Sequence, residues 1–232
     1  SSLEMGLAHN FEVREWPLFN ILRARTACQR GELEDAQKII DALVALPSVS
    51  DPKGVPKSSL KAIAHITPSE RAAVFLEQAH IYDRRSKYEE AIKVLQGALN
   101  SFRGTKDEAS FTIALSEMAA KHGDVDHALA ILRSVPKTAS HFLRARLALG
   151  RLLLRERNDK KGFIRAHKDL CDVQENESTL TLLGQAYMQI QDPDGAIAAF
   201  QQALKLSPSN SNLSLQLGEA LVSTHDFSRD RK

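Results

Sequence analysis

The sequence predicts an all-α protein, and its composition and the spacing of its apolar residues both support this class. Ala, Leu, Glu, Lys, Arg and Gln dominate the 232 residues, whereas Gly (11), Pro (8) and aromatic residues (6%) are few. The abundant residues favour helices, and the apolar ones recur with helical spacing. The chain is long enough for one large domain or two small ones with a buried core.

Several function classes are disfavoured by composition. The formal net charge is only +2, whereas a dedicated nucleic-acid-binding domain carries a concentrated basic face. Cys28 and Cys171 lie far apart and fit no metal-ligand spacing, so free thiols in a reducing compartment are expected. The longest apolar run, "LALGRLLL" at 147–154, is interrupted by charge and is too short for a membrane span.

The segment from Leu183 to Pro208, "LGQAYMQIQDPDGAIAAFQQALKLSP", predicts two amphipathic helices joined by the turn "QDPD". Gly184 and Ala196 are expected to let the two helices approach closely, and Ala203 to make room for a following pair. The tetratricopeptide repeat pattern is matched at Leu180, Leu183, Gly184, Tyr187, Ala196, Phe200, Ala203 and Pro208.

From Ala91 onward the small residue of the second helix recurs every 34 to 37 residues, as this repeat requires, and the 55-residue step from Ala36 to Ala91 requires an insertion of 21 residues. The predicted positions of this small residue are Ala36, Ala91, Ala128, Gly162 and Ala196. A first helix is predicted before each of them, at 17–30, 68–85, 110–122, 140–157 and 178–190, and a sixth at about 212–223. The predicted fold is therefore a right-handed superhelical solenoid of about five helix-turn-helix repeats plus a partial one.

One solenoid fragment is predicted over residues 1–232. Its parts are a tail of a preceding repeat at 1–10, repeats at 17–47, 68–104, 109–137, 140–174 and 177–210, and a partial repeat at 211–232. The fourth repeat is degenerate. An exposed insertion loop is expected at 48–67, because it is rich in Pro, Ser and Gly. Thr67 and Glu70 form a capping box for the next helix, with Pro68 in its first turn.

Motifs of catalysis and cofactor binding are not found, so no enzyme activity, cofactor or small-molecule substrate is expected. The most suggestive cluster is "HGDVDH", with His122, Asp124, Asp126 and His127. These types could ligate a metal. The favoured interpretation is a turn between paired helices in which Asp126 caps the second helix, without metal.

Charge is distributed unevenly. Residues 141–170 carry nine Lys or Arg against three acids, whereas 171–228 carry seven acids against one Lys. Two interpretations stay open, namely ordinary solvated helix faces and a basic ridge for an acidic partner beside an acidic ridge for a basic one. Arg144, Arg151 and Arg155 fall on one face of one helix.

A concave surface lined mostly by first helices is the expected binding site of such a solenoid. Side chains that escape the core should lie there, and Gln29 is one of them. The main candidates for a protein-binding groove are Arg25, His80, Arg84, Glu117, Lys121, Arg144, Arg151, Arg155, Gln185 and Gln189. Their mixed charge suits a specific folded partner or helix better than a generic peptide.

Four sequence strings extend the likeness beyond a generic repeat. "NFEVREWPLF", "ITPSERAAVFLE", "GDVDHALAIL" and "LLGQAYMQIQDPDGAI" occur in this order, and the chain resembles the tetratricopeptide repeat protein 21 family along its whole length. Members serve as the repeat-rich subunit, intraflagellar transport protein 139, of intraflagellar transport complex A.

The resemblance implies a central segment of a longer solenoid, acting as a non-enzymatic scaffold in retrograde transport and cargo trafficking. It also implies a location in the cytoplasm and the cilium or flagellum, at the axoneme and basal body, with other protein subunits of that complex as partners. The family offers no catalytic residues to transfer to this chain. The alternative is an adaptor, like a co-chaperone, that binds a short peptide in its groove.

Overall fold

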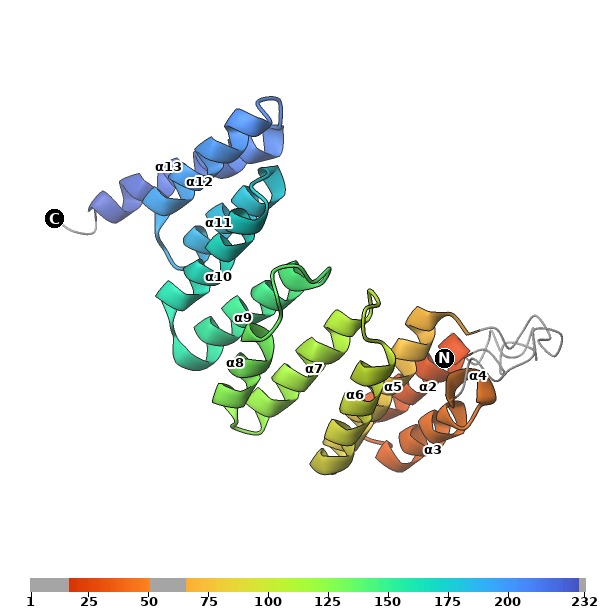
Figure 1. The fold of residues 1–232 in the computed structure, drawn as a ribbon. Helices are drawn as coiled ribbons and strands as arrows, with labels where there is room; N and C mark the ends of the chain where they lie inside the picture. Colours follow the sequence, from red (N-terminus) through yellow and green to blue (C-terminus); the bar gives the residue numbers. More distant parts are fainter. Residues whose placement is uncertain (1–16, 51–65, 230–232) are drawn as a thin grey trace, which may run out of the picture. The chain divides into compact units, whose positions relative to one another are not determined.

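The computed structural model describes residues 17–50 and 66–229, and within these ranges every regular element is an α-helix (Figure 1). Two compact units divide the chain between Leu115 and Ser116. The helices are α2 (Pro17–Arg30), α3 (Leu33–Val44), α4 (Pro47–Ser50), α5 (Pro68–Arg84), α6 (Tyr88–Ser101), α7 (Glu108–Lys121), α8 (Val125–Arg133), α9 (Phe142–Arg157), α10 (Lys160–Val173), α11 (Glu177–Gln189), α12 (Pro193–Leu206) and α13 (Ser211–Arg229). The predicted all-α class is confirmed.

The helix boundaries follow local sequence signals closely. Thr67 Oγ1 accepts the Glu70 N–H at 3.2 Å, and Glu70 Oε2 accepts the Thr67 N–H at 2.7 Å, so the predicted capping box is present. Pro68 is the first residue of α5. The last helix differs from expectation, because α13 continues to Arg229 instead of ending near residue 223. No helix in the described ranges is long and apolar enough to cross a bilayer.

A recurring turn joins the two helices of each pair. The residue just before the second helix's N-cap has a positive φ in every case, at Gly31, Ser86, Gly123, Asn158 and Gln191. The N-cap amide then bonds back to a carbonyl group in the first helix. The accepting residues are Ala27, Tyr82, Ala119, Leu153 and Tyr187. These bonds satisfy backbone groups that a helix end otherwise leaves unpaired.

The α9–α10 turn contains one extra residue. Asp192 bonds to a carbonyl group five residues earlier, as do the three other N-caps outside this turn, but Asp159 bonds to Leu153, six residues earlier. Counting from the N-cap, the residue equivalent to Ala196 is therefore Phe163, not Gly162. The predicted position of the small residue in the fourth repeat is wrong by one. It was obtained by counting 34 residues along the sequence, and this count omits the extra residue in the turn.

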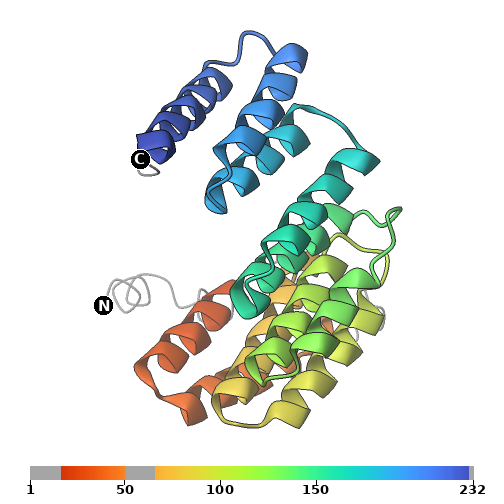
Figure 2. The same ribbon diagram turned by 90° about the vertical axis from the view of Figure 1, so that its left-hand side faces the viewer.

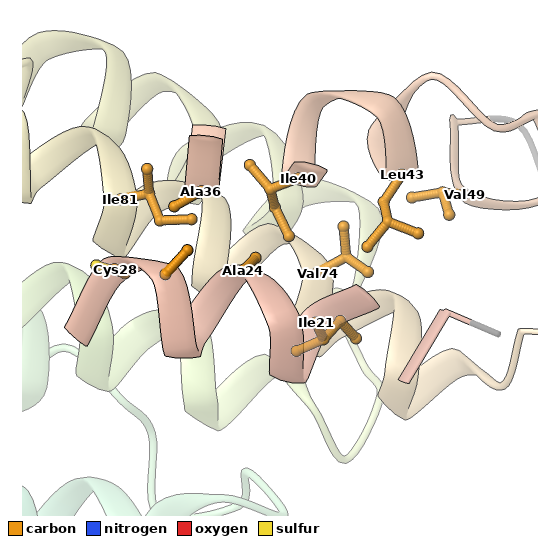
Figure 3. Packing of buried hydrophobic residues seen from close by; sticks show 10 residues of the cluster. Ile21, Ala24, Cys28, Ala36, Ile40, Leu43, Val49, Val74 and Ile81 are labelled. Atoms are coloured by element: carbon orange, nitrogen blue, oxygen red, sulfur yellow. The ribbon is translucent and has the colours of Figure 1, made fainter. Parts of the chain in front are cut away.

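The core of the N-terminal unit lies between α2, α3, α4 and α5 (Figure 3). Ile21 and Cys28 of α2 pack with Ile40 of α3 and with Val74 and Ile81 of α5, and all five are at most 2% exposed. Figure 3 shows Ala24 and Ala36 among these larger side chains. Small residues at these places permit close helix packing, as the repeat pattern predicts.

Part of the predicted insertion loop is helical and buried. Residues Pro47–Ser50 form the short helix α4, and Val49 is completely buried against the core. Arg71 Nε donates a hydrogen bond to the Val49 carbonyl oxygen at 2.6 Å, which ties α4 to α5. The expectation of a loop is therefore wrong for residues 48–50, which are helical, and the expectation of exposure is wrong at Val49, whereas Ser50 is exposed. Residues 51–65, the predicted tail at 1–10, and the C-terminal end at 230–232 lie outside the described residues.

In the C-terminal unit, α12 packs between α11 and α13 (Figure 1, Figure 2). A Cβ atom at Gly184 would lie 2.4 Å from the Phe200 ring, so only Gly fits this contact without movement. Ala196, Phe200 and Ala203 are at most 1% exposed. Gly195 makes a second close approach, to the Tyr187 ring, which the sequence pattern did not reveal.

Candidate protein-binding surface

Equivalent positions on the first helices carry the predicted binding residues. In each first helix, one residue accepts the hydrogen bond from the N-cap of the second helix. The residue two positions before it and the residue two positions after it are four apart, so they share one helix face. The earlier position holds Arg25, His80, Glu117, Arg151 and Gln185, and the later one holds Gln29, Arg84, Lys121, Arg155 and Gln189. We call these ten the shared-face residues. All ten are exposed, as is Arg144, the remaining candidate.

In the N-terminal unit, the shared-face residues Arg25 of α2 and His80 of α5 lie beside the buried carboxylate of Glu77. Arg25 Nε and Nη2 donate to Glu77 Oε2 at 3.0 and 2.9 Å. His80 Nδ1 lies 3.7 Å from Glu77 Oε1, too far for a hydrogen bond. The Glu77 side chain is 5% exposed, whereas those of Arg25 and His80 are about half exposed. Arg25 is therefore held by an internal partner.

The ionisation of Glu77 depends on these neighbours. Burial alone raises the pKa of the Glu77 carboxyl group, but the interactions with His80 and Arg25 outweigh burial, and the net shift is downward. An ionised, buried carboxylate requires such compensation. The sequence did not indicate Glu77, because a Glu within an amphipathic helix reads as a solvent-facing residue and nothing marks this one as buried.

The two cysteines are free thiols, as predicted, and neither resembles a nucleophile. Cys28 is buried next to this cluster, and burial raises its pKa more than Arg84 lowers it. Burial likewise raises the pKa of the Cys171 thiol. Reactive cysteines require a stabilised thiolate. Both thiols are instead protonated at neutral pH.

In the C-terminal unit, a small pocket of about 140 Å³ lies between α7, α8 and α9. Its lining residues are Ser116, Glu117, Leu132, Ala148, Arg151, Leu152 and Arg155. Three of them, Glu117, Arg151 and Arg155, are shared-face residues and are exposed. The others are buried, so the pocket combines an apolar floor with a charged rim. The structure thus brings three of the predicted residues together.

The arginines of α9 differ in whether they have internal partners. Arg146 is 9% exposed, its Nε lies 3.4 Å from Asp169 Oδ2, and its guanidinium group stacks on Phe142. Arg157 Nη2 donates to Asp126 Oδ1 at 2.6 Å. Arg155 Nε bonds to Glu156 Oε1 at 2.5 Å. Within the part of the chain that the structure describes, Arg151 has no hydrogen-bond or ion-pair partner.

A second hollow, of about 360 Å³, lies between α11 and the start of α13. Among its lining residues are Glu177, Gln185 and Asn210. Glu177 Oε1 accepts from Asn210 Nδ2 at 2.5 Å, and Gln185 Nε2 lies 3.4 Å from Gln216 Oε1. Three of its polar side chains, those of Glu177, Asn210 and Gln185, therefore already have internal partners. Lys121, Arg144 and Gln189 line neither this hollow nor the α7–α9 pocket.

The "HGDVDH" segment forms the α7–α8 turn. Asp124, not Asp126, is the N-cap of α8, because its side chain accepts the His127 N–H at 3.1 Å. Asp126 instead pairs with Arg157, so the predicted capping role was assigned to the wrong aspartate. Among the described residues, no three His, Cys, Asp or Glu side chains are placed to hold a metal ion.

Comparison with known proteins places the whole chain among repeat proteins. A family model described as "Tetratricopeptide repeat protein 21 ARM repeat" matches residues 11–170, and the general tetratricopeptide repeat model matches 178–210. Tetratricopeptide repeat protein 21B of Mus musculus is 35% identical over 228 residues, or 98% of this chain. Tetratricopeptide repeat protein 21A of Homo sapiens is 31% identical over 97%.

The chain spans only 17% of the length of each of these relatives. Among solved structures, BtubC from P. vanneervenii aligns over 90% of this chain and 86% of its own, with a TM-score of 0.45 and 14% identity. A likeness this distant adds nothing to the assignment, which depends on the family model and the sequence identities. On those grounds, the chain belongs to the tetratricopeptide repeat protein 21 family.

Proposed function

We propose that this chain is a segment of a non-enzymatic protein–protein interaction scaffold that acts within intraflagellar transport complex A. The observation that carries the proposal is the similarity to tetratricopeptide repeat protein 21B over 98% of the chain. The family resemblance supplies the link to retrograde transport and cargo trafficking in the cilium or flagellum. The partners in this proposal are the other protein subunits of the complex.

The surface of the helix pairs supports a binding role. The shared-face residues all have polar side chains, and all ten are exposed. Stacked helix pairs present such side chains at regular intervals, which suits an extended contact with another folded protein. Specificity in such a contact comes from matching charges and from polar groups that must find partners.

The proposal is tested with the full-length parent protein, because this chain is a small part of its relatives. The tagged protein is expressed in ciliated cells and purified under mild conditions. We expect the other subunits of complex A to co-purify with it, whereas an unrelated helical-repeat protein with the same tag retains none. Failure of the full-length protein to retain any of these subunits would rule the proposal out.

The alternative is an adaptor that captures a short peptide, and the α7–α9 pocket is the observation that favours it. An adaptor of this kind acts outside a fixed complex, so the full-length protein would not co-purify with the subunits of complex A. The two functions therefore predict opposite outcomes in the same purification.

A further inference from the structure

We infer that the α7–α9 pocket is a docking site for an acidic side chain of a protein partner, with an apolar side chain beside it. This inference rests on the proposed function as an interaction scaffold and names what one site on it would recognise. The occupant follows from the size of the pocket, the nature of its floor and the unequal pairing of its charged rim.

Size selects a side chain over a small molecule. The pocket holds about 140 Å³, whereas sites for drug-sized ligands or cofactors hold roughly 300–1,000 Å³. A water molecule takes about 30 Å³ in the liquid, so the pocket has room for a few waters or for one side chain. The pocket therefore fits one apolar side chain of a partner chain on its floor, with the acidic side chain at its rim.

The floor selects for apolar contact. Leu132, Leu152 and Ala148 are 1%, 4% and 6% exposed, and they form its base. An apolar atom group placed on them leaves water without losing any hydrogen bond. This base distinguishes the pocket from a plain basic surface, and a purely charged ligand such as a phosphate would leave it uncovered.

The rim selects for a carboxylate. Arg151 has no partner among the described residues, and Arg155 uses its Nε on Glu156, which leaves its terminal nitrogens without a hydrogen-bond partner among those residues. A guanidinium group offers five N–H donors in a fork that matches a carboxylate. The surrounding segment 141–170 carries nine basic residues against three acidic ones, so its field attracts an acidic partner.

Glu117 determines which side of the pocket a carboxylate would occupy. It lies on α7, across the pocket from the two arginines of α9, and no ion pair joins it to either one. Its negative charge repels a carboxylate that approaches from the α7 side. The acidic group is therefore directed to the α9 side, and replacement of Glu117 by Gln should strengthen binding instead of weakening it.

The test uses the purified 232-residue chain and fluorescein-labelled octapeptides in which one Glu is followed by Leu at a spacing of one to four residues. Binding is measured by fluorescence anisotropy at low and at physiological salt. We expect at least one spacing to bind saturably and more weakly at higher salt. The same peptides with Gln in place of Glu should lose about tenfold in affinity, as expected for a lost charge-assisted hydrogen bond.

Four variants locate the site. Arg151→Gln should weaken binding by about tenfold and Arg155→Gln by less, since its Nε is already engaged. Glu117→Gln should tighten binding by about two- to threefold. Arg165→Gln, which removes an exposed arginine on α10 outside the pocket, is the matched control and should change nothing. Circular dichroism and thermal melting confirm that each variant is folded.

Three results would overturn the inference. They are the absence of saturable binding by any Glu-containing peptide, equal loss of affinity in Arg165→Gln and Arg151→Gln, and stronger competition by a single-stranded oligonucleotide than by unlabelled peptide. The co-purification experiment is independent of these measurements. A pocket that fails to bind leaves the scaffold function standing, and a scaffold that fails to assemble leaves the peptide affinities unchanged.

Discussion

The helix pairs α9–α10 and α11–α12 share one plan but fill the space between their helices differently. In α12, Ala196 stands four residues after the N-cap and Phe200 stands eight after it. In α10 the same places hold Phe163 and His167, whose rings meet edge to face at 4.6 Å. Each pair places a Gly of its first helix beneath these rings, Gly150 or Gly184.

This difference shows how a degenerate repeat can keep its packing. Phe163 adds a ring where α12 has Ala196. A Cβ atom at Gly150 would lie 3.2 Å from the rings of Phe163 and His167, whereas one at Gly184 would lie 2.4 Å from the Phe200 ring. The larger residue is nevertheless buried, since Phe163 is only 2% exposed.

The largest effect is expected for Phe163→Ala. This side chain is 2% exposed and is the added ring of the α9–α10 pair. Its removal should lower the free energy of unfolding by about 3–5 kcal/mol, because burial is lost and a cavity is left. Urea unfolding followed by circular dichroism measures the change. Arg165→Ala, on the exposed face of the same helix, is the control, and equal losses in both variants would contradict the packing derived for Phe163.

The next largest effect on stability is expected at Gly184, and a much smaller one at Gly150. Gly184→Leu should cost about 1–3 kcal/mol or more, because the Phe200 ring already occupies the space of a Cβ atom. Gly150→Ala should be nearly neutral. Its Cβ atom would lie 3.2 Å from the rings of Phe163 and His167, which need to move only slightly, and Ala gains about 1 kcal/mol of helix propensity over Gly. Thermal melting of both variants tests the contrast. An unchanged melting temperature for Gly184→Leu would refute the packing of α11 on α12.

A smaller effect concerns the two N-caps. Asp159 Oδ1 accepts the Gly162 N–H at 2.8 Å, and Asp192 Oδ1 accepts the Gly195 N–H at 3.1 Å. Asp159→Ala and Asp192→Ala should each lower stability by about 1 kcal/mol, whereas the Asn variants keep the acceptor and lose little. Chemical denaturation of the four variants gives the comparison. A loss at Asp192 alone would mean that the longer α9–α10 turn does not depend on its cap.

Local signals were sufficient to predict most of the fold. The Thr67–Glu70 capping box and the recurring small residues act within one or two turns of chain, so their physical causes are visible in the sequence. The extra residue before Asp159 was not visible, because Asn158 adopts a left-handed conformation (φ 48°) that other residue types also adopt in these turns. The burial of Val49 depends on α5, which is distant in sequence.

The candidate binding surface, too, could be predicted only in part from the sequence. Helical periodicity was enough to predict the exposure of all ten candidates, from Arg25 to Gln189. It could not show which charges have internal partners, because pairing depends on neighbouring helices. Glu77 is buried by the packing of α2 against α5, and Arg146 by that of α8 and α10 against α9. Only the folded arrangement singles out Arg151 among the arginines of α9.

The smallest expected effect is a pH dependence of stability that His167 gives to the α9–α10 pair and that α11–α12, with Phe200 at the same place, lacks. His167 is 7% exposed, and its Nδ1–H donates to the Phe163 carbonyl oxygen at 2.9 Å. Burial lowers its pKa, and the hydrogen bond only partly offsets this shift. Below about pH 6.5, the histidine binds a proton in the unfolded protein but not in the folded one. The free energy of unfolding therefore decreases as the pH falls.

His167→Phe tests that effect, because it places in α10 the residue that α12 has at the equivalent position. We expect the wild-type free energy of unfolding to fall between pH 7.5 and 5.5 by more than that of the variant. The difference between the two proteins, measured by urea unfolding at each pH, isolates His167 from the other titrating groups. A difference that stays constant over this range would mean that the pKa of His167 is the same in the folded and the unfolded protein, and its ring would then have to be more open to water than its burial indicates.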